Sequence, residues 1–361
     1  MIAAVSSRPF VKAAVSAGYS VVALDVFADA DTMQAAEQVY KIEYANCGFN
    51  ASQFEVALAK IDMHDMVGFA YGSGFEAQPD LLERISEHLP LIGNLPKTVR
   101  DLKDAPKFFQ TLDALSIPHP EVHFKPLLDA TGWLRKEEGG SGGTHVQEAP
   151  RNQPLAQGQY YQRVIEGKPI SMLFAANGND VKVVGFNQQW VAPILGKPYR
   201  YGGIVGHANL PEDIKRSLEA TALKITCAFK LRGLNSLDVI WQDSQFWVLE
   251  INPRLSSTLD LYQTKESNLF ALHVQAAAGD LNRFPAISKI SKARNVLYAS
   301  QDLVIPNDLT WPEWTADIPM PLTAIPQYQP VCTVLAEADN AQESQALVVS
   351  RLKELSTLLY P

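Results

Sequence analysis

Acidic and amide side chains gather in the segment SLDVIWQDSQFWVLEINPR, residues 236–254. Its pattern predicts a β-hairpin with strands at 236–241 and 246–252 joined by a polar turn. Glu250 and Asn252 are two residues apart, so their side chains share one face of the second strand. Carboxylate and amide oxygens are the hard ligands that Mg²⁺ prefers when it bridges nucleotide phosphates. The segment therefore predicts a magnesium site, with Arg254 just beyond it.

Asp238 lies on the first strand, and the pairing of the strands decides whether it joins this site. If Asp238 faces Glu250, then Gln242 faces Phe246 and a three-residue loop, 243–245, connects the strands. A two-residue loop would turn Asp238 to the opposite face, because a slip of one residue reverses the face. We adopt the first register as a hypothesis. The alternative for the whole segment is a solvated polar strand face that ends in an ordinary Asn-Pro turn.

A glycine-rich loop follows the predicted strand GWLRK, which ends at Lys136. Four glycines and one serine fill residues 139–143, and glycines let backbone N–H groups approach phosphate oxygens closely. One alternative is a flexible hairpin tip. Another is a hydrolase, because GGSGG also fits the GxSxG pattern around Ser141. A hydrolase would need a helix directly after Ser141, and the sequence places neither His207 nor His273 as its base.

The surrounding elements predict an α/β protein with an α+β middle region. Helical and apolar strand patterns alternate through the first 97 residues, which is typical of a parallel sheet. The YGSG segment at 71–74 has Ala77 where a dinucleotide fingerprint needs its third glycine, so we interpret it as a tight strand-to-helix turn. A helix is expected to start near Asp104, with Pro106 in its first turn. The predicted domains are 1–97, 98–284 and 285–361, the last a small β-rich module with a terminal helix.

Composition limits the classes of partner and the compartment. The chain has 361 residues, with 31 Lys and Arg against 39 Asp and Glu, a net charge of −8 that argues against nucleic-acid binding. Cys47, Cys227 and Cys332 are far apart and odd in number, which favours a reducing, cytoplasmic location. No apolar run approaches the roughly 20 residues of a membrane span. We therefore expect a cytoplasmic protein with small-molecule partners, and the sequence leaves the oligomeric state open, a homodimer included.

The order of the motifs resembles the ATP-grasp superfamily. The motifs are IPHP at 117–120, WLRKEEGGSGG at 133–143, QRVIEGKPIS at 162–171 and LEINPR at 249–254. The N-terminal segment resembles the pre-ATP-grasp domain, and residues 319–336 resemble the C-terminal β segment of biotin-carboxylase-like members. The resemblance implies an ATP- and Mg²⁺-dependent ligase that joins a carboxylate to an amine through an acyl phosphate and releases ADP and phosphate. An ATP-grasp phosphotransferase and a non-catalytic nucleotide-binding protein are the alternatives.

The resemblance also implies roles for individual residues. Those expected to bind phosphate are Lys107, Lys136, Gly140, Ser141, Gly142 and Gly143. Gln162 and the backbone of Val164 would meet adenine. Asp238, Glu250 and Asn252 would bind magnesium, and Arg254 would steady the transferred phosphoryl group.

Two of these assignments depart from the family pattern. Lys103 is an alternative to Lys107, since residues four apart share a face of one helix; we favour Lys107, which opens the better helical segment. Pro169 stands where many relatives place a ribose-binding carboxylate, so ribose recognition is left unassigned. Short stretches, including RVIEGKPIS, also resemble family members linked to pterin-dependent one-carbon metabolism, which suggests a role in cofactor biosynthesis.

Overall fold

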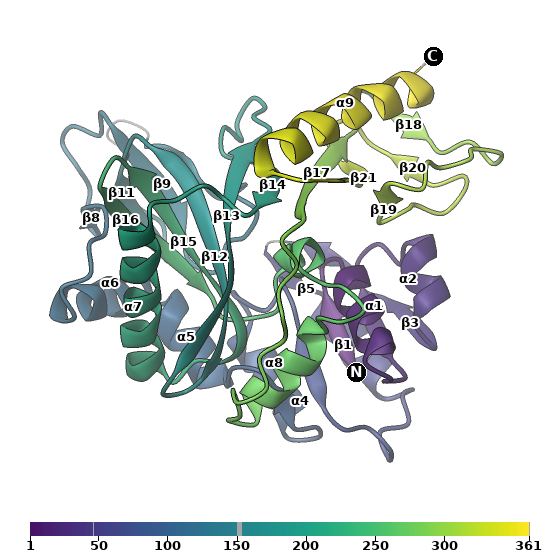
Figure 1. The fold of residues 1–361 in the computed structure, drawn as a ribbon, viewed down its shortest axis with the longest axis horizontal. Coiled ribbons are helices and arrows are strands. Elements are labelled where there is room, and N and C mark those ends of the chain that lie inside the picture. Colours follow the sequence, from purple (N-terminus) through teal and green to yellow (C-terminus); the bar gives the residue numbers. More distant parts are fainter. Residues whose placement is uncertain (46, 150–153, 361) are drawn as a thin grey trace.

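The computed structural model describes residues 1–45, 47–149 and 154–360 (Figure 1). Its first part is the parallel sheet that the alternating pattern predicted, with all pairings parallel. In spatial order the strands are β3 (Gln38–Lys41), β2 (Val22–Asp25), β1 (Ile2–Ala4), β6 (Phe69–Tyr71) and β7 (Leu91–Ile92). The accompanying elements are α1 (Arg8–Ser16), α2 (Ala30–Ala35), α3 (Ala51–Leu58), α4 (Pro79–Ser86) and the hairpin β4 (Tyr44–Ala45) and β5 (Gly48–Phe49).

Two short helices lead from this sheet into the middle of the chain. The helices are α5 (Pro96–Lys103) and α6 (Ala105–Ala114). Asp104 separates them, and its side chain accepts a hydrogen bond from the backbone N–H of Lys107 at 2.9 Å, which caps α6. The helix start expected near Asp104 is thus confirmed, while residues 99–103 belong to a separate helix. A four-stranded sheet follows, in the order β10 (Gln147–Glu148), β9 (Trp133–Glu137), β11 (Gln159–Arg163) and β8 (Val122–His123).

An eight-stranded antiparallel sheet forms the body of the molecule. Its spatial order is β16 (Gln245–Asn252), β15 (Arg232–Gln242), β12 (Lys168–Asn177), β13 (Val181–Val191), β14 (Tyr201–Gly206), β17 (Ser291–Tyr298), β21 (Pro330–Ala338) and β19 (Thr315–Ala316). The last three strands lie beyond residue 285, so the C-terminal segment continues this sheet. The boundaries 97/98 and 284/285 stay predictions.

Alternating side chains on β12 explain why both faces of the sheet are covered. Met172 and Phe174 join the core under α7 (Glu212–Phe229). Leu173 and Ala175 point the other way, into the core formed with α1 and α8 (Leu269–Ala277). The 3₁₀ helix η1 (Ser257–Leu261) contributes Leu259 to that second core. The period of two along the strand thus joins the N-terminal sheet to the central one.

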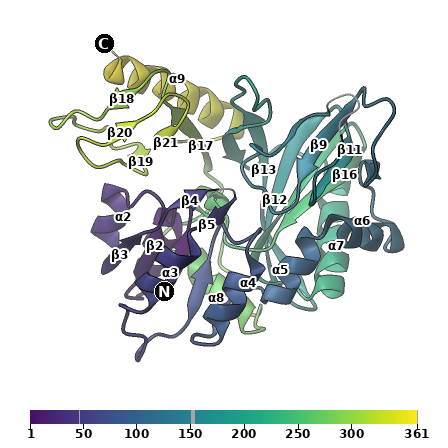
Figure 2. The same cartoon turned by 180° about the vertical axis from the view of Figure 1, so that it is seen from behind.

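The C-terminal helix α9 (Ala341–Leu359) packs on the far end of the central sheet, through Val348 and Leu355 against Val334. Figure 2 shows it at the opposite end of the molecule from α6 and α7. The pair β18 (Leu303–Val304) and β20 (Ala324–Ile325) lies beside it. Among the described residues, no helix has the length and apolar character that crossing a bilayer requires.

Candidate active site

The hairpin β15–β16 places Asp238 opposite Glu250, as the hypothesis required. The turn differs from the expected one. Gln242 pairs with Gln245 and not with Phe246, so the connecting loop has two residues and not three. Asp243 begins that turn with a φ of 52°, a left-handed conformation that aspartate tolerates. The register then shifts at a β-bulge between Asp238 and Val239. This bulge restores the face that a regular two-residue hairpin would have lost.

The amide and carboxylate side chains at this end of the hairpin contact one another. Asn252 donates its Nδ2 hydrogen to Oδ2 of Asp238 at 2.9 Å. Gln189, on β13, donates from Nε2 to the other oxygen of Asp238 at 3.4 Å. Burial, together with the nearby charge of Glu250, raises the pKa of Asp238 to about 6. The site therefore holds two carboxylates close together. Their mutual repulsion would be costly if no positive charge lay nearby.

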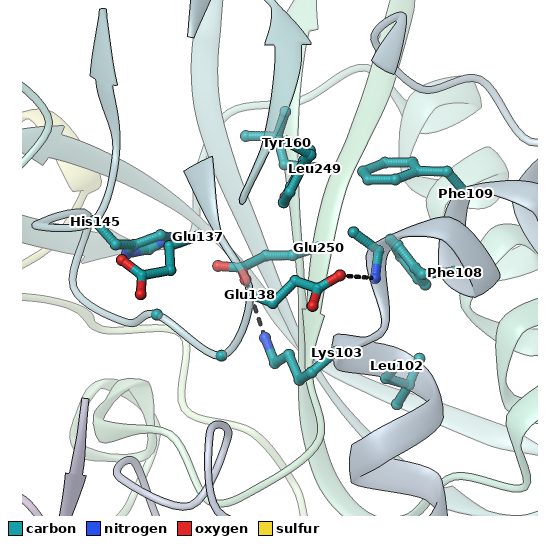
Figure 3. A pocket seen from close by; sticks show the side chains of 13 residues that line it. Leu102, Lys103, Phe108, Phe109, Glu137, Glu138, His145, Tyr160, Leu249 and Glu250 are labelled. Atoms are coloured by element: carbon teal, nitrogen blue, oxygen red, sulfur yellow. Dashed lines mark hydrogen bonds and ion pairs between the residues drawn. The ribbon is translucent and has the colours of Figure 1, made fainter. Parts of the chain in front are cut away.

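Two lysines supply that charge. Lys103, the last residue of α5, lies with its Nζ 3.0 Å from Oε2 of Glu250 (Figure 3). Burial acts to raise the pKa of Glu250, but Lys103 and Lys136 outweigh it and hold that pKa at about 2. Lys136 is buried, which lowers its own pKa, and its Nζ donates to Oε1 of Gln162 at 3.1 Å. Glu250 is thus an ionised carboxylate that pairs with Lys103 and is influenced by the charge of Lys136.

Lys107, the lysine that we favoured for phosphate, does not contact Glu250 in this structure. Its Nζ pairs with Oδ1 of Asp101 at 2.7 Å, and 46% of its side chain is exposed. Only 9% of the Lys103 side chain is exposed. The physical reason is the break at Asp104: the lysines lie on two helices, so the spacing of four does not put them on one face.

A small cavity opens beside Glu250 and Lys103. Its other lining residues come from α6, from the glycine loop and from the neighbouring strands: Leu102, Ala105, Phe108, Phe109, Glu137, Glu138, Gly139, Gly140, His145, Tyr160 and Leu249. Its volume is about 30 Å³, whereas small-molecule sites usually measure roughly 300–1,000 Å³. Figure 3 shows the segment with Glu138 beside this space. Gly139 and Gly140 of the glycine loop thus share a small cavity with Glu250.

The glycine loop is fitted closely to its neighbours. A Cβ added to Gly140 would come within 2.1 Å of the His145 ring, and one on Gly143 within 1.9 Å of the Tyr199 carbonyl oxygen. Gly143 also has a φ of +72°, which other residues rarely adopt. The carbonyl of Gly142 accepts a hydrogen bond from the N–H of Tyr201 at 2.9 Å. Gly139 and Gly140 line the cavity, while Gly142 and Gly143 pack on the segment before β14 and its first residue.

Ser141 lies next to Tyr44, a residue of the N-terminal part of the chain. Burial and the charge of Glu76 raise the pKa of Tyr44 to about 12, and a hydrogen bond with the Ser141 side chain opposes that rise. The next regular element after Ser141 is strand β10, so the helix of a nucleophile elbow does not follow. His273 accepts from the N–H of Leu234 at 2.8 Å within the core. The hydrolase alternative therefore has neither its turn nor His273 as its base.

The two residues expected to meet adenine lie at the end of β11, next to Lys136. Gln162 is 2% exposed, and within the described chain its Nε2 has no hydrogen-bond partner. Val164 donates its backbone N–H to the carbonyl of Gly132 at 2.9 Å. A base could therefore reach Val164 only through its carbonyl oxygen. Neither residue lines the small cavity beside Glu250.

Arg254 follows the hairpin and contacts the N-terminal part of the chain. Its Nε donates to Oε1 of Glu76 at 2.8 Å, and its Nη2 lies 3.4 Å from Oδ1 of Asn252. Our sequence reasoning missed Glu76 and Gln189 as members of the site, and it named Lys103 only as the alternative to Lys107. Glu76 lies two residues after the YGSG turn, and this acidic residue near a glycine turn is the signal that could have pointed to it. Within the described residues no group of three or more His, Cys, Asp or Glu side chains is placed to hold a metal.

Comparisons with known proteins agree with this geometry. Residues 102–258 match the family model described as the ATP-grasp domain. The chain is 22% identical over 359 residues to the uncharacterized protein MJ0776 of Methanocaldococcus jannaschii. This alignment covers 93% of our chain and 88% of that protein.

Solved structures share the fold over nearly the whole chain. Biotin carboxylase from Campylobacter jejuni superimposes with a TM-score of 0.71 at 13% identity, over 96% of this chain and 89% of that one. N5-carboxyaminoimidazole ribonucleotide synthetase from Thermotoga maritima gives 0.66 at 14% identity, over 98% and 97%. The biotin carboxylase domain of the Hydrogenobacter thermophilus 2-oxoglutarate carboxylase, solved with MgADP, ADP and bicarbonate, gives 0.73 at 12%, over 97% and 88%. The resemblance predicted from the motifs is confirmed: residues 102–258 of this chain form an ATP-grasp domain.

Proposed function

We propose that the protein is an ATP- and Mg²⁺-dependent ligase that joins a small-molecule carboxylate to an amine through an acyl phosphate. The observation that carries the proposal is the position of Glu250, which lies opposite Asp238, contacts Lys103 and shares a cavity with the glycine loop. Such a site combines groups for a divalent cation with groups for a polyanion. The family model matched by residues 102–258 supports it.

The donor set fits magnesium by its chemistry. Asp238 and Glu250 offer carboxylate oxygens on one face, and Asn252 adds an amide group hydrogen-bonded to Asp238. Bound there, the ion would offset negative charge on the phosphate oxygens. With a pKa of about 2, Glu250 is ionised at neutral pH and can act as a negatively charged ligand.

The remaining groups would hold phosphates and exclude water. Lys103 and Lys136 act on the charge of Glu250, and Gly139 and Gly140 line the cavity, where glycines would let the backbone approach phosphate oxygens closely. The cavity of about 30 Å³ is too small for a whole nucleotide, and in this proposal the glycine loop opens for binding and closes afterwards. Closure would protect an acyl phosphate from hydrolysis. Arg254 would steady the phosphoryl oxygens.

Bond changes follow from this arrangement. A carboxylate oxygen of the substrate attacks the γ-phosphorus, and the bond from that phosphorus to the bridging oxygen breaks, which releases ADP. The amine nitrogen then attacks the carbonyl carbon of the acyl phosphate, phosphate leaves, and the nitrogen loses a proton. No side-chain nucleophile takes part. We place this chemistry in the cytoplasm, which the three free thiols, all in the described part of the chain, support.

The nucleotide products test the proposal. With a panel of carboxylates and amines, ATP should give ADP and phosphate, because the lysines and loop amides would surround the terminal phosphates. Hydroxylamine should trap the acyl phosphate as a hydroxamate, detectable by mass spectrometry. AMP as the main nucleotide product would refute the mechanism. A stable phosphorylated carboxylate that no amine consumes would establish the phosphotransferase alternative, and nucleotide binding without turnover the non-catalytic one.

The loop offers a prediction of its own. Lys136→Ala should weaken ATP binding about tenfold, since it removes a charge buried beside Glu250. Ser141→Ala should stay within about twofold of the wild type, because the loop would act through backbone N–H groups. Isothermal titration with ATP and Mg²⁺ measures both. Esterase activity that disappears in Ser141→Ala would favour the hydrolase instead.

A further inference from the structure

Glu76 is an ionised carboxylate in the interior of the protein. It follows β6 and the turn at 72–74, and only 3% of the residue is exposed. Both of its oxygens are used: Oε2 accepts from the N–H of Gly74 at 2.7 Å, and Oε1 accepts from Nε of Arg254 at 2.8 Å. Burial acts to raise the pKa of Glu76, but Arg254 and Lys103 lower it. The side chain is therefore a charged group fixed at both oxygens.

The same end of β6 also holds the backbone around Arg254. The carbonyl of Tyr71 accepts from the N–H of Leu255 at 3.1 Å. The Tyr71 hydroxyl donates to the carbonyl of Asn94 at 2.8 Å and lies 3.4 Å from that of Pro253. The residues before and after Arg254 are thus docked on β6 independently of Glu76. Glu76 adds a contact to the guanidinium itself.

That contact decides how the guanidinium is turned. One terminal nitrogen, Nη1, donates to the Leu255 carbonyl at 3.2 Å, and Nε is held by Glu76. The other, Nη2, is then directed at Asn252, 3.4 Å away at the end of the acidic hairpin. Since a guanidinium is planar, fixing Nε and Nη1 leaves Nη2 a single direction. Without Glu76 the side chain could rotate away from the hairpin.

The geometry points to Glu76 as a positioning residue that orients Arg254 toward the reacting phosphoryl group, an assignment that rests on the proposed function. The N-terminal domain would thereby complete the active site of the ATP-grasp domain. A purely structural role, as a link between the two domains, is the alternative. It differs in one respect: a link changes stability, whereas orienting Arg254 changes the rate of phosphoryl transfer.

The test needs no knowledge of the natural substrate. Acetyl phosphate and MgADP should yield ATP and acetate, the reverse of acyl phosphate formation, as the phosphoryl group moves to the terminal oxygen of ADP. Glu76→Gln keeps the shape but loses the charge, and we expect a rate about 10- to 100-fold lower, with a KM for ADP within about threefold of the wild type. Glu76→Ala should be slower still. An unchanged rate in both variants would overturn the assignment.

Asn94→Ala is the matched control. Asn94 is 1% exposed and joins the same domains through Asn235 at 2.7 Å, without contact to Arg254 in the hydrogen bonds described. We expect a lower Tm and an unchanged rate at a temperature below both transitions. A rate that falls in Asn94→Ala as much as in Glu76→Gln would show that domain docking alone matters, and would overturn the positioning role.

A spectroscopic measurement separates this inference from the proposed function. The ¹⁵Nε–¹H resonance of Arg254, identified by its loss in Arg254→Lys, should lie downfield in the wild type and move in Glu76→Ala. If the wild-type protein makes no ATP from acetyl phosphate, the ligase proposal fails while this resonance still reports the contact. A resonance that does not move in Glu76→Ala would sink the positioning role, whatever the enzyme's activity.

Discussion

Glu250→Gln is expected to lower turnover about 100- to 1,000-fold, because it removes a fixed negative charge where a cation and the transferred phosphoryl group would meet. Glutamine has the same size and keeps one oxygen, so packing around the side chain should survive. Glu250 faces Asp238 and lies 3.0 Å from Nζ of Lys103. In the variant the cation would lose a charged ligand, and Lys103 would lose its carboxylate partner. The change should therefore affect chemistry far more than folding.

The measurement is ADP release at saturating ATP and Mg²⁺, together with thermal unfolding. Asp243→Asn is the matched control, since it removes a carboxylate from the exposed turn of the same hairpin, and asparagine tolerates the φ of 52° there. We expect the control to keep its turnover and both variants to keep a Tm close to the wild type. A Glu250→Gln enzyme within about fivefold of wild-type turnover would contradict a metal-binding role.

The acidic hairpin shows what a sequence pattern can and cannot predict. The alternation of side chains predicts that Glu250 and Asn252 share a face, and the pairing of Asp238 with Glu250 is confirmed. The turn and the bulge were not predicted. A bulge is stabilised by tertiary contacts and has no reliable local pattern. The shorter turn and the bulge compensate for each other, and together they give the pairing that we expected from a three-residue loop.

The choice of Lys107 as the phosphate ligand stays a prediction, and the structure shows why spacing could not decide which lysine contacts Glu250. Asp104 was predicted to start a helix, and it caps α6 as expected. A capped start also means that the preceding residues leave the axis of that helix, so a spacing of four between Lys103 and Lys107 says nothing about a shared face. Which lysine approaches Glu250 then depends on how α5 packs, and no spacing in the sequence encodes that.

Elements that are short or distant in sequence were the hardest to predict. Strand β1 has only three residues, too few for a periodic pattern. The C-terminal strands were expected as a separate module, yet β17 pairs with β14 and extends the central sheet. The contact between Glu76 and Arg254 spans 178 residues. Such contacts depend on the relative position of two domains, which the local pattern of either one leaves open.

Lys103→Ala is expected to weaken ATP binding about 100-fold, whereas Lys107→Ala should change it less than about twofold. Lys103 is nearly buried beside Glu250, so its charge is poorly screened and acts on phosphates at short range. Its removal also leaves Glu250 to repel the incoming polyanion. Lys107 is half exposed and already paired with Asp101, an arrangement of small energetic weight.

The two variants form their own matched pair, since they remove the same side chain four residues apart. Titration calorimetry with MgATP gives both affinities, and thermal unfolding checks that each protein is folded. Lys103→Arg adds a third point: it keeps the charge and should recover part of the affinity, because an ammonium and a guanidinium differ in shape but not in sign. A larger loss in Lys107→Ala than in Lys103→Ala would show that the lysine near Asp101 moves to the phosphates on closure, and would restore the assignment that the motif alone favoured.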